Sequence, residues 1–116
     1  MITKNRKKEL EYFCKQYYEW KAEIVVRTRK GTDEFDDPTG EEAIRIYELN
    51  KKIELVDNCL AKTTDEYLIP YIKKHICDGA TYEYLRTKLN MQCGRRQFYE
   101  LRDIFFLKLS QEKHLL

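Results

Sequence analysis

Apolar residues recur along most of this chain at alternating spacings of three and four residues, the period expected of α-helices with one buried face. Hardly any segment alternates with the period of two that marks a half-buried β-strand. Only 4 glycines and 2 prolines interrupt the pattern, so long stretches can remain helical without a break. The pattern predicts an all-α protein.

Two apolar stripes in the N-terminal half predict two long helices. The first helix should end near the basic segment 27–31, because cations ahead of a glycine suit the negative end of the helix dipole. The second should begin between Pro38 and Glu41, after an acidic loop of about nine residues. Helices joined in this way pack antiparallel, as a hairpin. The first stripe is Leu10, Phe13, Tyr17, Trp20 and Ile24, and the second is Ile46, Leu49, Ile53, Val56 and Leu60.

A helical hairpin over residues 1–62 has a thin core, and neither of its helices would be stable alone. We therefore expect this segment to be an oligomerisation unit, with both stripes facing a second copy of the chain. A second interpretation stays open, in which the same side chains form the ordinary core of a single chain.

The C-terminal half, residues 63–116, contains shorter elements. Proline is tolerated in the first turn of a helix, so Pro70 predicts a helix that starts near Ile69 or carries an early kink. Gly79 is the expected left-handed cap at the end of that helix.

Two further helices should follow the cap. Thr81 is a sound N-cap for a helix of about eight residues. The segment 90–94 breaks this helix, and a longer one begins at about Gly94, with Cys93 or Gly94 as its N-cap. The buried face of the longer helix should consist of Phe98, Leu101, Phe105 and Leu109.

A short helix, a tight turn and a longer helix with basic residues at its start are typical of a helix-turn-helix, so residues 63–116 are predicted to bind double-stranded DNA. In such a motif the N-terminal end of the second helix enters the major groove. There Arg binds guanine, and Gln binds adenine, through paired hydrogen bonds. The amides beside Thr81 suit a phosphate. The predicted DNA-binding residues are Thr81, Arg86, Lys88, Arg95, Arg96, Gln97, Tyr99, Glu100 and Arg102.

The net charge of +2 conceals an uneven distribution of charged residues. Residues 1–30 carry nine basic and four acidic side chains, and residues 80–116 carry seven and four. Residues 31–58 carry three basic and nine acidic side chains, which would repel phosphate. The basic surplus of the C-terminal segment favours a DNA partner. The surplus of the N-terminal segment either pairs with the acidic helix or adds to the DNA contact.

Other chemistry finds little support in the sequence. The 4 cysteines form no Cys-x-x-Cys pair and are accompanied by only 2 histidines, so we expect no metal site. The acidic loop 33–37 lacks the spacing of a calcium site. Without a phosphate-binding loop or a paired-carboxylate motif, neither an enzyme nor a cofactor is expected. No apolar run approaches the roughly 20 residues that cross a bilayer, and no signal peptide is predicted, which favours a cytoplasmic protein.

Four segments resemble a known family of regulators. Thr-Tyr-Glu-Tyr-Leu at 81–85 and Arg-Arg-Gln-Phe-Tyr at 95–99, followed by Leu-Arg at 101–102, resemble its two DNA-binding helices. Segments 11–24 and 37–44 are similar to its first half. The family is that of the RinA/ArpU-type late-gene transcriptional regulators of phages and prophages of Gram-positive bacteria. The region-4 DNA-binding helices of sigma factors are similar at a greater distance.

The resemblance implies a sequence-specific activator of late phage genes in the cytoplasm of a bacterial host cell. It also implies a homo-oligomer that contacts host RNA polymerase. The chain departs from the family at the turn, where five residues separate Leu89 from Arg95 and Gly94 stands in place of a capping serine.

Two other functions stay open. A helical protein–protein interaction module, such as an adaptor or an anti-repressor, would use the hairpin without contacting DNA. A small terminase subunit also combines a helix-turn-helix with an oligomerising hairpin, although its DNA-binding element commonly comes first. Arg95 and Arg96 at the start of a helix favour a DNA reader, because an interaction module has no need of them.

Overall fold

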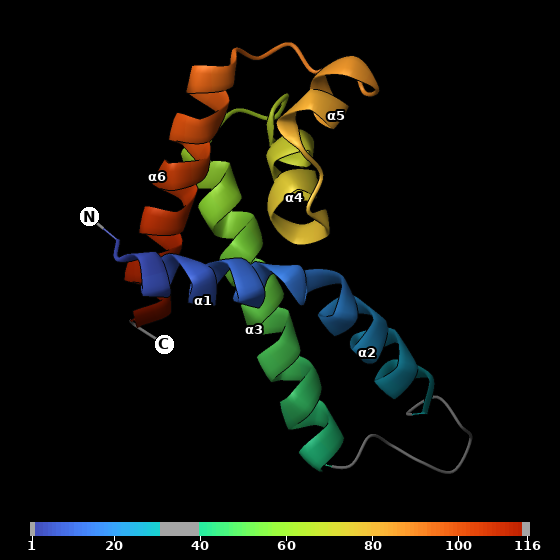
Figure 1. Ribbon diagram of the computed structural model, residues 1–116. Helices are drawn as coiled ribbons and strands as arrows, with labels where there is room; N and C mark the ends of the chain where they lie inside the picture. The colour runs from blue at the N-terminus through green and yellow to red at the C-terminus, as the bar shows by residue number, and fades with distance from the viewer. Residues whose placement is uncertain (1, 31–39, 115–116) are drawn as a thin grey trace.

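The computed structural model describes residues 2–30 and 40–114. Within them the chain is all-α, with six helices and no strand (Figure 1). The predicted acidic loop and Pro38 lie outside the described residues.

The first two helices form one bent helix. α1 (Lys4–Lys15) and α2 (Tyr17–Lys30) meet at Gln16, whose ψ of −3° departs from the usual helical value of about −42°. The carbonyl of Gln16 still accepts from the N–H of Trp20, at 2.9 Å, so the chain continues as a helix in a new direction. The apolar stripe predicted a single helix here, because its spacing passes through the bend unchanged.

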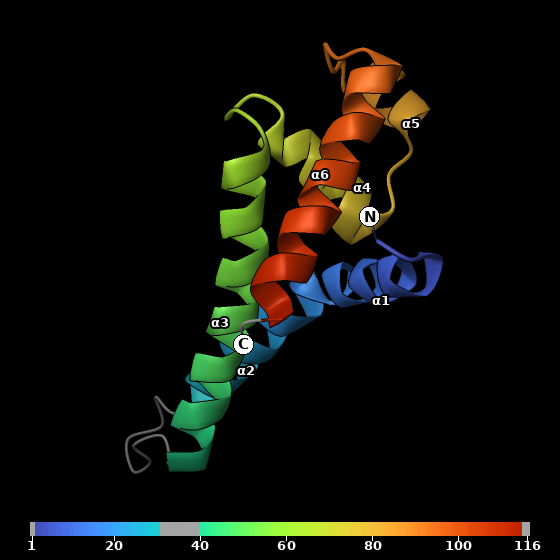
Figure 2. The same ribbon diagram turned by 90° about the vertical axis from the view of Figure 1, so that its left-hand side faces the viewer.

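The remaining helices are α3 (Gly40–Thr63), α4 (Ile69–Asp78), α5 (Tyr82–Thr87) and α6 (Arg95–His114). α2 packs against α3 and the two form an arm at one end of the molecule, while α3 also packs against α6 (Figures 1 and 2). α1 lies across the bundle and packs against α4 and α6. The N-terminal stripe therefore packs against two sets of helices. Its α1 part faces α4 and α6, and its α2 part faces α3.

One buried cluster draws on all six helices. Residues on both sides of the predicted division at 62/63 contribute to it, among them Leu60 from α3 and Phe105 from α6, each 0% exposed. Most of the stripe residues belong to this cluster. The buried ones are Leu10, Tyr17, Trp20, Leu49, Ile53, Val56 and Leu60, while Phe13, Ile24 and Ile46 are partly buried.

Burial of the two stripes agrees with the interpretation in which they form the core of a single chain. The side chains that already fill this core are not free to contact a second copy. Association through the N-terminal half stays a prediction, and it needs surfaces other than the centre of the stripes.

Polar contacts hold the arm and the bundle together. In the arm, Arg27 pairs with Glu42 of α3 at 2.9 Å and with Glu23 of its own helix at 3.1 Å. Nearer the bundle, the hydroxyl of buried Tyr17 donates to the carboxylate of Asp57. Because charge-assisted hydrogen bonds are shorter and more directional than neutral ones, these contacts add to the apolar packing in orienting α2 against α3.

The predicted start and end of α4 are confirmed. The helix begins at Ile69 with Pro70 in its first turn, where no backbone N–H is needed. It ends at Gly79, whose φ of 76° is left-handed, and the Gly79 N–H donates to the carbonyl of His75. The chain turns at this cap, and α5 begins three residues later.

Candidate nucleic-acid interface

The start of α5 is capped as predicted. The hydroxyl of Thr81 accepts from the N–H of Tyr84 at 3.1 Å, which satisfies one of the free amides of the first turn. α5 is shorter than the eight residues expected, because it already ends at Thr87 and Lys88 caps it. The Thr81 hydroxyl is thus occupied by its own helix, and Lys88 is exposed.

The segment 88–94 forms a closed turn. Asn90 adopts a left-handed conformation with φ 55°, which asparagine tolerates better than most residues. Met91 is fully buried, and its N–H donates to the carbonyl of Leu85 at 3.0 Å. Arg86 donates to the carbonyl of Met91 at 3.1 Å. Arg86, a predicted DNA contact, therefore also fastens the turn to α5.

Two tyrosines hold the rest of the turn. The hydroxyl of Tyr82 donates to the carbonyl of Cys93 at 2.6 Å in a buried hydrogen bond. The hydroxyl of Tyr67 accepts from the N–H of Gln92 at 2.9 Å. Sequence reasoning missed both contacts. They join residues 11 and 25 positions apart, and no local spacing signals such pairs.

The register of α6 follows from its first hydrogen bond. The N–H of Phe98 donates to the carbonyl of Gly94 at 2.9 Å, so Gly94, and not Cys93, occupies the N-cap position. Phe98 is 0% exposed, and its ring lies 5.4 Å from that of Tyr82, centroid to centroid. Arg95, Arg96 and Gln97 are consequently the first three residues of α6, and all three are exposed.

The ion pairs of the two arginines at this end of α6 lie at the surface, and the Arg95 guanidinium also lies over the rings of Tyr82 and Tyr99, 5.6 and 5.9 Å from their centroids. The Arg95 side chain is 65% exposed and pairs with Glu83 of α5 at 2.6 Å. The Arg96 side chain is 94% exposed and pairs with Glu100 at 3.0 Å. Exposed pairs of this kind contribute about 0–1 kcal/mol. A phosphate or a base edge can therefore replace the carboxylates at little cost.

The other predicted DNA contacts on α6 are closer to the protein. Tyr99 is half-buried. Arg102 lies over its ring, 4.8 Å from the centroid, and pairs with Asp103 at 3.2 Å. The Arg102 side chain is only 21% exposed. The structure thus brings Arg95, Arg96 and Gln97 together at one exposed tip, whereas Arg102 lies further along the helix in a more enclosed position.

His75 supports the base of this tip. Its Nδ1 lies 2.7 Å from the carbonyl of Ala80, and since a carbonyl only accepts, Nδ1 is the protonated nitrogen. Its ring packs edge-on against Phe98 at 5.1 Å. Burial lowers the pKa of His75, and the nearby charge of Arg102 lowers it further.

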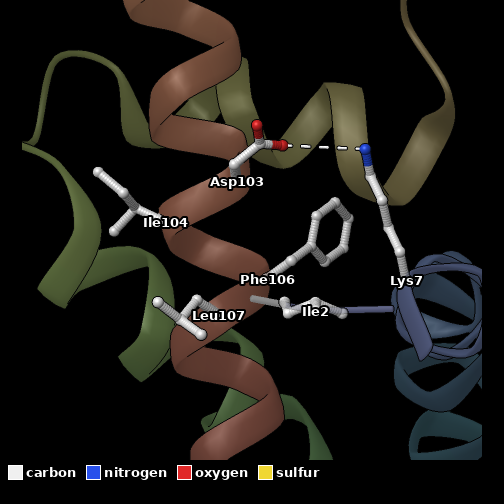
Figure 3. Close-up of a pocket in the computed structure, with 6 residues that line it drawn as sticks. All are labelled: Ile2, Lys7, Asp103, Ile104, Phe106 and Leu107. Atoms are coloured by element: carbon white, nitrogen blue, oxygen red, sulfur yellow. Dashed lines mark ion pairs between the residues drawn. The ribbon is translucent and has the colours of Figure 1, made fainter. Parts of the chain in front are cut away.

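A second surface feature lies beside the middle of α6. Ile2, Phe106, Ile104 and Leu107 line an open apolar hollow of about 360 Å³ (Figure 3). Ile104 and Leu107 are 42% and 41% exposed. Lys7 of α1 and Asp103 of α6 stand at its edge, with Nζ and Oδ1 3.8 Å apart. The hollow is therefore apolar at its floor and electrically neutral at its edge.

Comparison with known proteins finds no matching family model, no matching curated protein and no matching solved structure. No helix within residues 2–30 and 40–114 has the length and apolar character needed to cross a membrane. In the same part of the chain, no three His, Cys, Asp or Glu residues gather where they would hold a metal ion.

Proposed function

We propose that the protein is a sequence-specific DNA-binding transcriptional regulator. In this proposal α5, the segment 88–94 and α6 form a helix-turn-helix, and α6 reads the major groove. The observation that carries the proposal is the first turn of α6, where Arg95, Arg96 and Gln97 are all exposed. Arginine and glutamine are the side chains that bind guanine and adenine in paired fashion, and a helix N-terminus adds a positive dipole toward phosphate.

The closed turn supports the proposal, because base readout requires side chains in a fixed register. The Tyr82–Cys93 hydrogen bond ties the end of the turn to α5, and Phe98 ties the first turn of α6 to the core. The arginines are therefore exposed side chains on a backbone that these contacts hold in place. This combination suits a reader that exchanges weak carboxylate pairs for contacts with DNA.

The more specific role, activation of late phage or prophage genes with contact to host RNA polymerase, comes from the sequence resemblance alone. We propose it as the biological setting of the DNA-binding activity. A small terminase-like subunit would use the same tip for DNA, so DNA binding is the part of the proposal that both functions share.

We further propose that the regulator is a homo-oligomer and that the hollow beside α6 is the place of contact. The predicted stripes are mostly committed to the core, whereas Ile104 and Leu107 remain open. Lys7 and Asp103 at the edge carry opposite charges, so a two-fold axis perpendicular to the line between them would place each of them opposite its complement on a second copy. Small helix-turn-helix domains usually reach useful affinity as dimers, in which two recognition helices bind two half-sites.

The same hollow favours the competing function, a helical protein–protein interaction module that does not contact DNA. The two functions differ in what they require of Arg95 and Arg96. An interaction module that uses the hollow tolerates the loss of both arginines, and a DNA reader does not.

The test is a selection of duplexes from a random DNA pool, followed by fluorescence anisotropy with the selected duplex. Paired contacts to bases are worth about 1–3 kcal/mol each, so the double variant Arg95→Ala, Arg96→Ala should bind at least about 30-fold more weakly. Its helical circular-dichroism signal should not change, since both ion pairs are exposed. The control Lys51→Ala, Lys74→Ala removes two positive charges elsewhere and should bind nearly as well as the parent. Equal binding by the parent and the arginine variant would show that α6 does not read DNA.

A further inference from the structure

A row of lysines lies along the outer side of α1, and the helix-turn-helix does not use it. Lys4, Lys8 and Lys15 are four and seven positions apart, which places them on one side of the helix. All three are exposed. Tyr12 lies on the same side and is 69% exposed, so its hydroxyl is available to a partner.

The lysine row differs from the other cations of α1, which are engaged with the protein. Arg6 pairs with Glu9 at 3.0 Å and donates to the hydroxyl of Ser110 of α6 at 3.3 Å. Lys7 pairs with Asp103. In contrast, none of the three lysines makes an ion pair with any residue that the structure describes. Their charge is directed to solvent and is available to an external anion.

The row is continuous with the basic surface of α6. α1 packs against α6 and α4 and lies across them in Figures 1 and 2. Lys15 and Arg102 line the same hollow of about 190 Å³, together with Glu11 and His75. Arg102 in turn lies over the ring of Tyr99. The guanidinium of Arg95 also lies over this ring, 5.9 Å from its centroid. Basic side chains therefore follow one another from the tip of α6 through Arg102 to Lys15 of α1, with Glu11 and Asp103 beside them.

The helices of the arm lack the positive surplus that α1 carries. α1 has five basic and two acidic residues, whereas the described residues of α2 and α3, 17–30 and 40–63, have eight basic and seven acidic. The sequence 31–39, which joins the two helices of the arm, adds acidic residues only. The positive surplus is thus largest in α1, and α6, with five basic and three acidic residues, also carries one.

From this placement we infer that the outer side of α1 is a second DNA-binding surface, which contacts the phosphate backbone next to the groove that α6 reads. The inference rests on the proposed function and extends its interface beyond the helix-turn-helix. Lysine acts here as a point charge toward phosphate and carries no base information. The row therefore contributes affinity and orientation on the duplex, and α6 contributes the choice of sequence.

Salt dependence provides the test, because each phosphate contact changes the slope of log K against log salt by about 0.9. The variant is Lys4→Gln, Lys8→Gln, Lys15→Gln. The matched control, Lys21→Gln, Lys51→Gln, Lys52→Gln, removes the same charge from the arm. Both are titrated against the duplex selected by the parent protein and against an unrelated duplex, from 50 to 200 mM salt.

The α1 variant should lose about two to three units of slope on both duplexes and keep the parent's preference between them. The arm control should keep the parent's slope. A slope equal to that of the control, with specific binding intact, would overturn the α1 surface and leave the proposed function standing. Absence of binding by the parent to any duplex would overturn both. Binding by α1 to phosphatidylserine vesicles, with no change of the DNA slope, would assign the row to a membrane surface instead.

Discussion

Replacing Tyr82 by Phe tests how the turn before α6 is held. The substitution removes only the hydroxyl that donates to the carbonyl of Cys93 at 2.6 Å. It keeps the ring that packs against Phe98. Because Tyr82 and Cys93 are 8% and 6% exposed, water does not readily replace the lost donor, and the carbonyl is left without its partner.

An unsatisfied buried carbonyl costs about 1–3 kcal/mol. For a chain of this length each kcal/mol lowers the melting temperature by about 4 °C, so Tyr82→Phe should melt about 8 °C below the parent protein. Exchange of the Phe98 amide with solvent should also accelerate, because that amide forms the first hydrogen bond of α6.

Calorimetry of Tyr82→Phe is compared with that of Tyr84→Phe, a neighbour on α5 that is 49% exposed. An exposed substitution usually changes stability by less than about 0.5 kcal/mol, so the control should melt within about 2 °C of the parent. If the two variants melt at the same temperature, the hydrogen bond to Cys93 does not hold the turn, and the reasoning about a fixed register for α6 is wrong.

Two further predictions concern the pH dependence of folding and the apolar hollow. Burial keeps the pKa of His75 below 6.5 in the folded protein, so the unfolded chain binds more protons just below that pH and stability falls as the pH drops. The urea midpoint should therefore decrease from pH 7 to 5.5 in the parent and less so in His75→Gln, and a parent-like decrease in that variant would exclude His75 as the cause. Ile104→Glu, Leu107→Glu should lower the mass in sedimentation velocity at equal concentration, whereas an unchanged oligomer mass would place the contact elsewhere.

Local signals were sufficient for the start and end of α4 and for the start of α5, although not for the length of α5. Pro70, Gly79 and Thr81 act within one turn of their own position, through a missing donor, a left-handed φ and a capping hydroxyl. Such effects depend on neighbouring backbone alone, so the sequence predicts them without knowledge of the fold. The start of α6 was predicted for the same reason, within the choice between Cys93 and Gly94.

In the N-terminal half, local signals predicted the helices but not which other helices cover their apolar face. The stripe from Leu10 to Ile24 has the correct period, but a period states only that one face is apolar, and not which element covers it. The bend at Gln16 divides that face between α3 on one side and α4 and α6 on the other. The stripe predicted packing against the second helix of a hairpin along its whole length, whereas only its α2 part packs against α3 and its α1 part packs against α4 and α6.

The candidate site also combines features that the sequence predicts with features that depend on the tertiary structure. The sequence by itself determined an all-α chain, the start and end of α4, the start of α5, the approximate start of α6, and a cluster of cations at that start, because periodicity, caps and charge act locally. Only the tertiary structure decided that Arg86 and Arg102 are partly engaged with the protein, that Tyr67 and Tyr82 hold the turn, and that Lys15 of α1 lines the same hollow as Arg102 of α6. These outcomes depend on which segments, distant in the chain, the shared core brings into contact, and the period of a sequence carries no information about that choice.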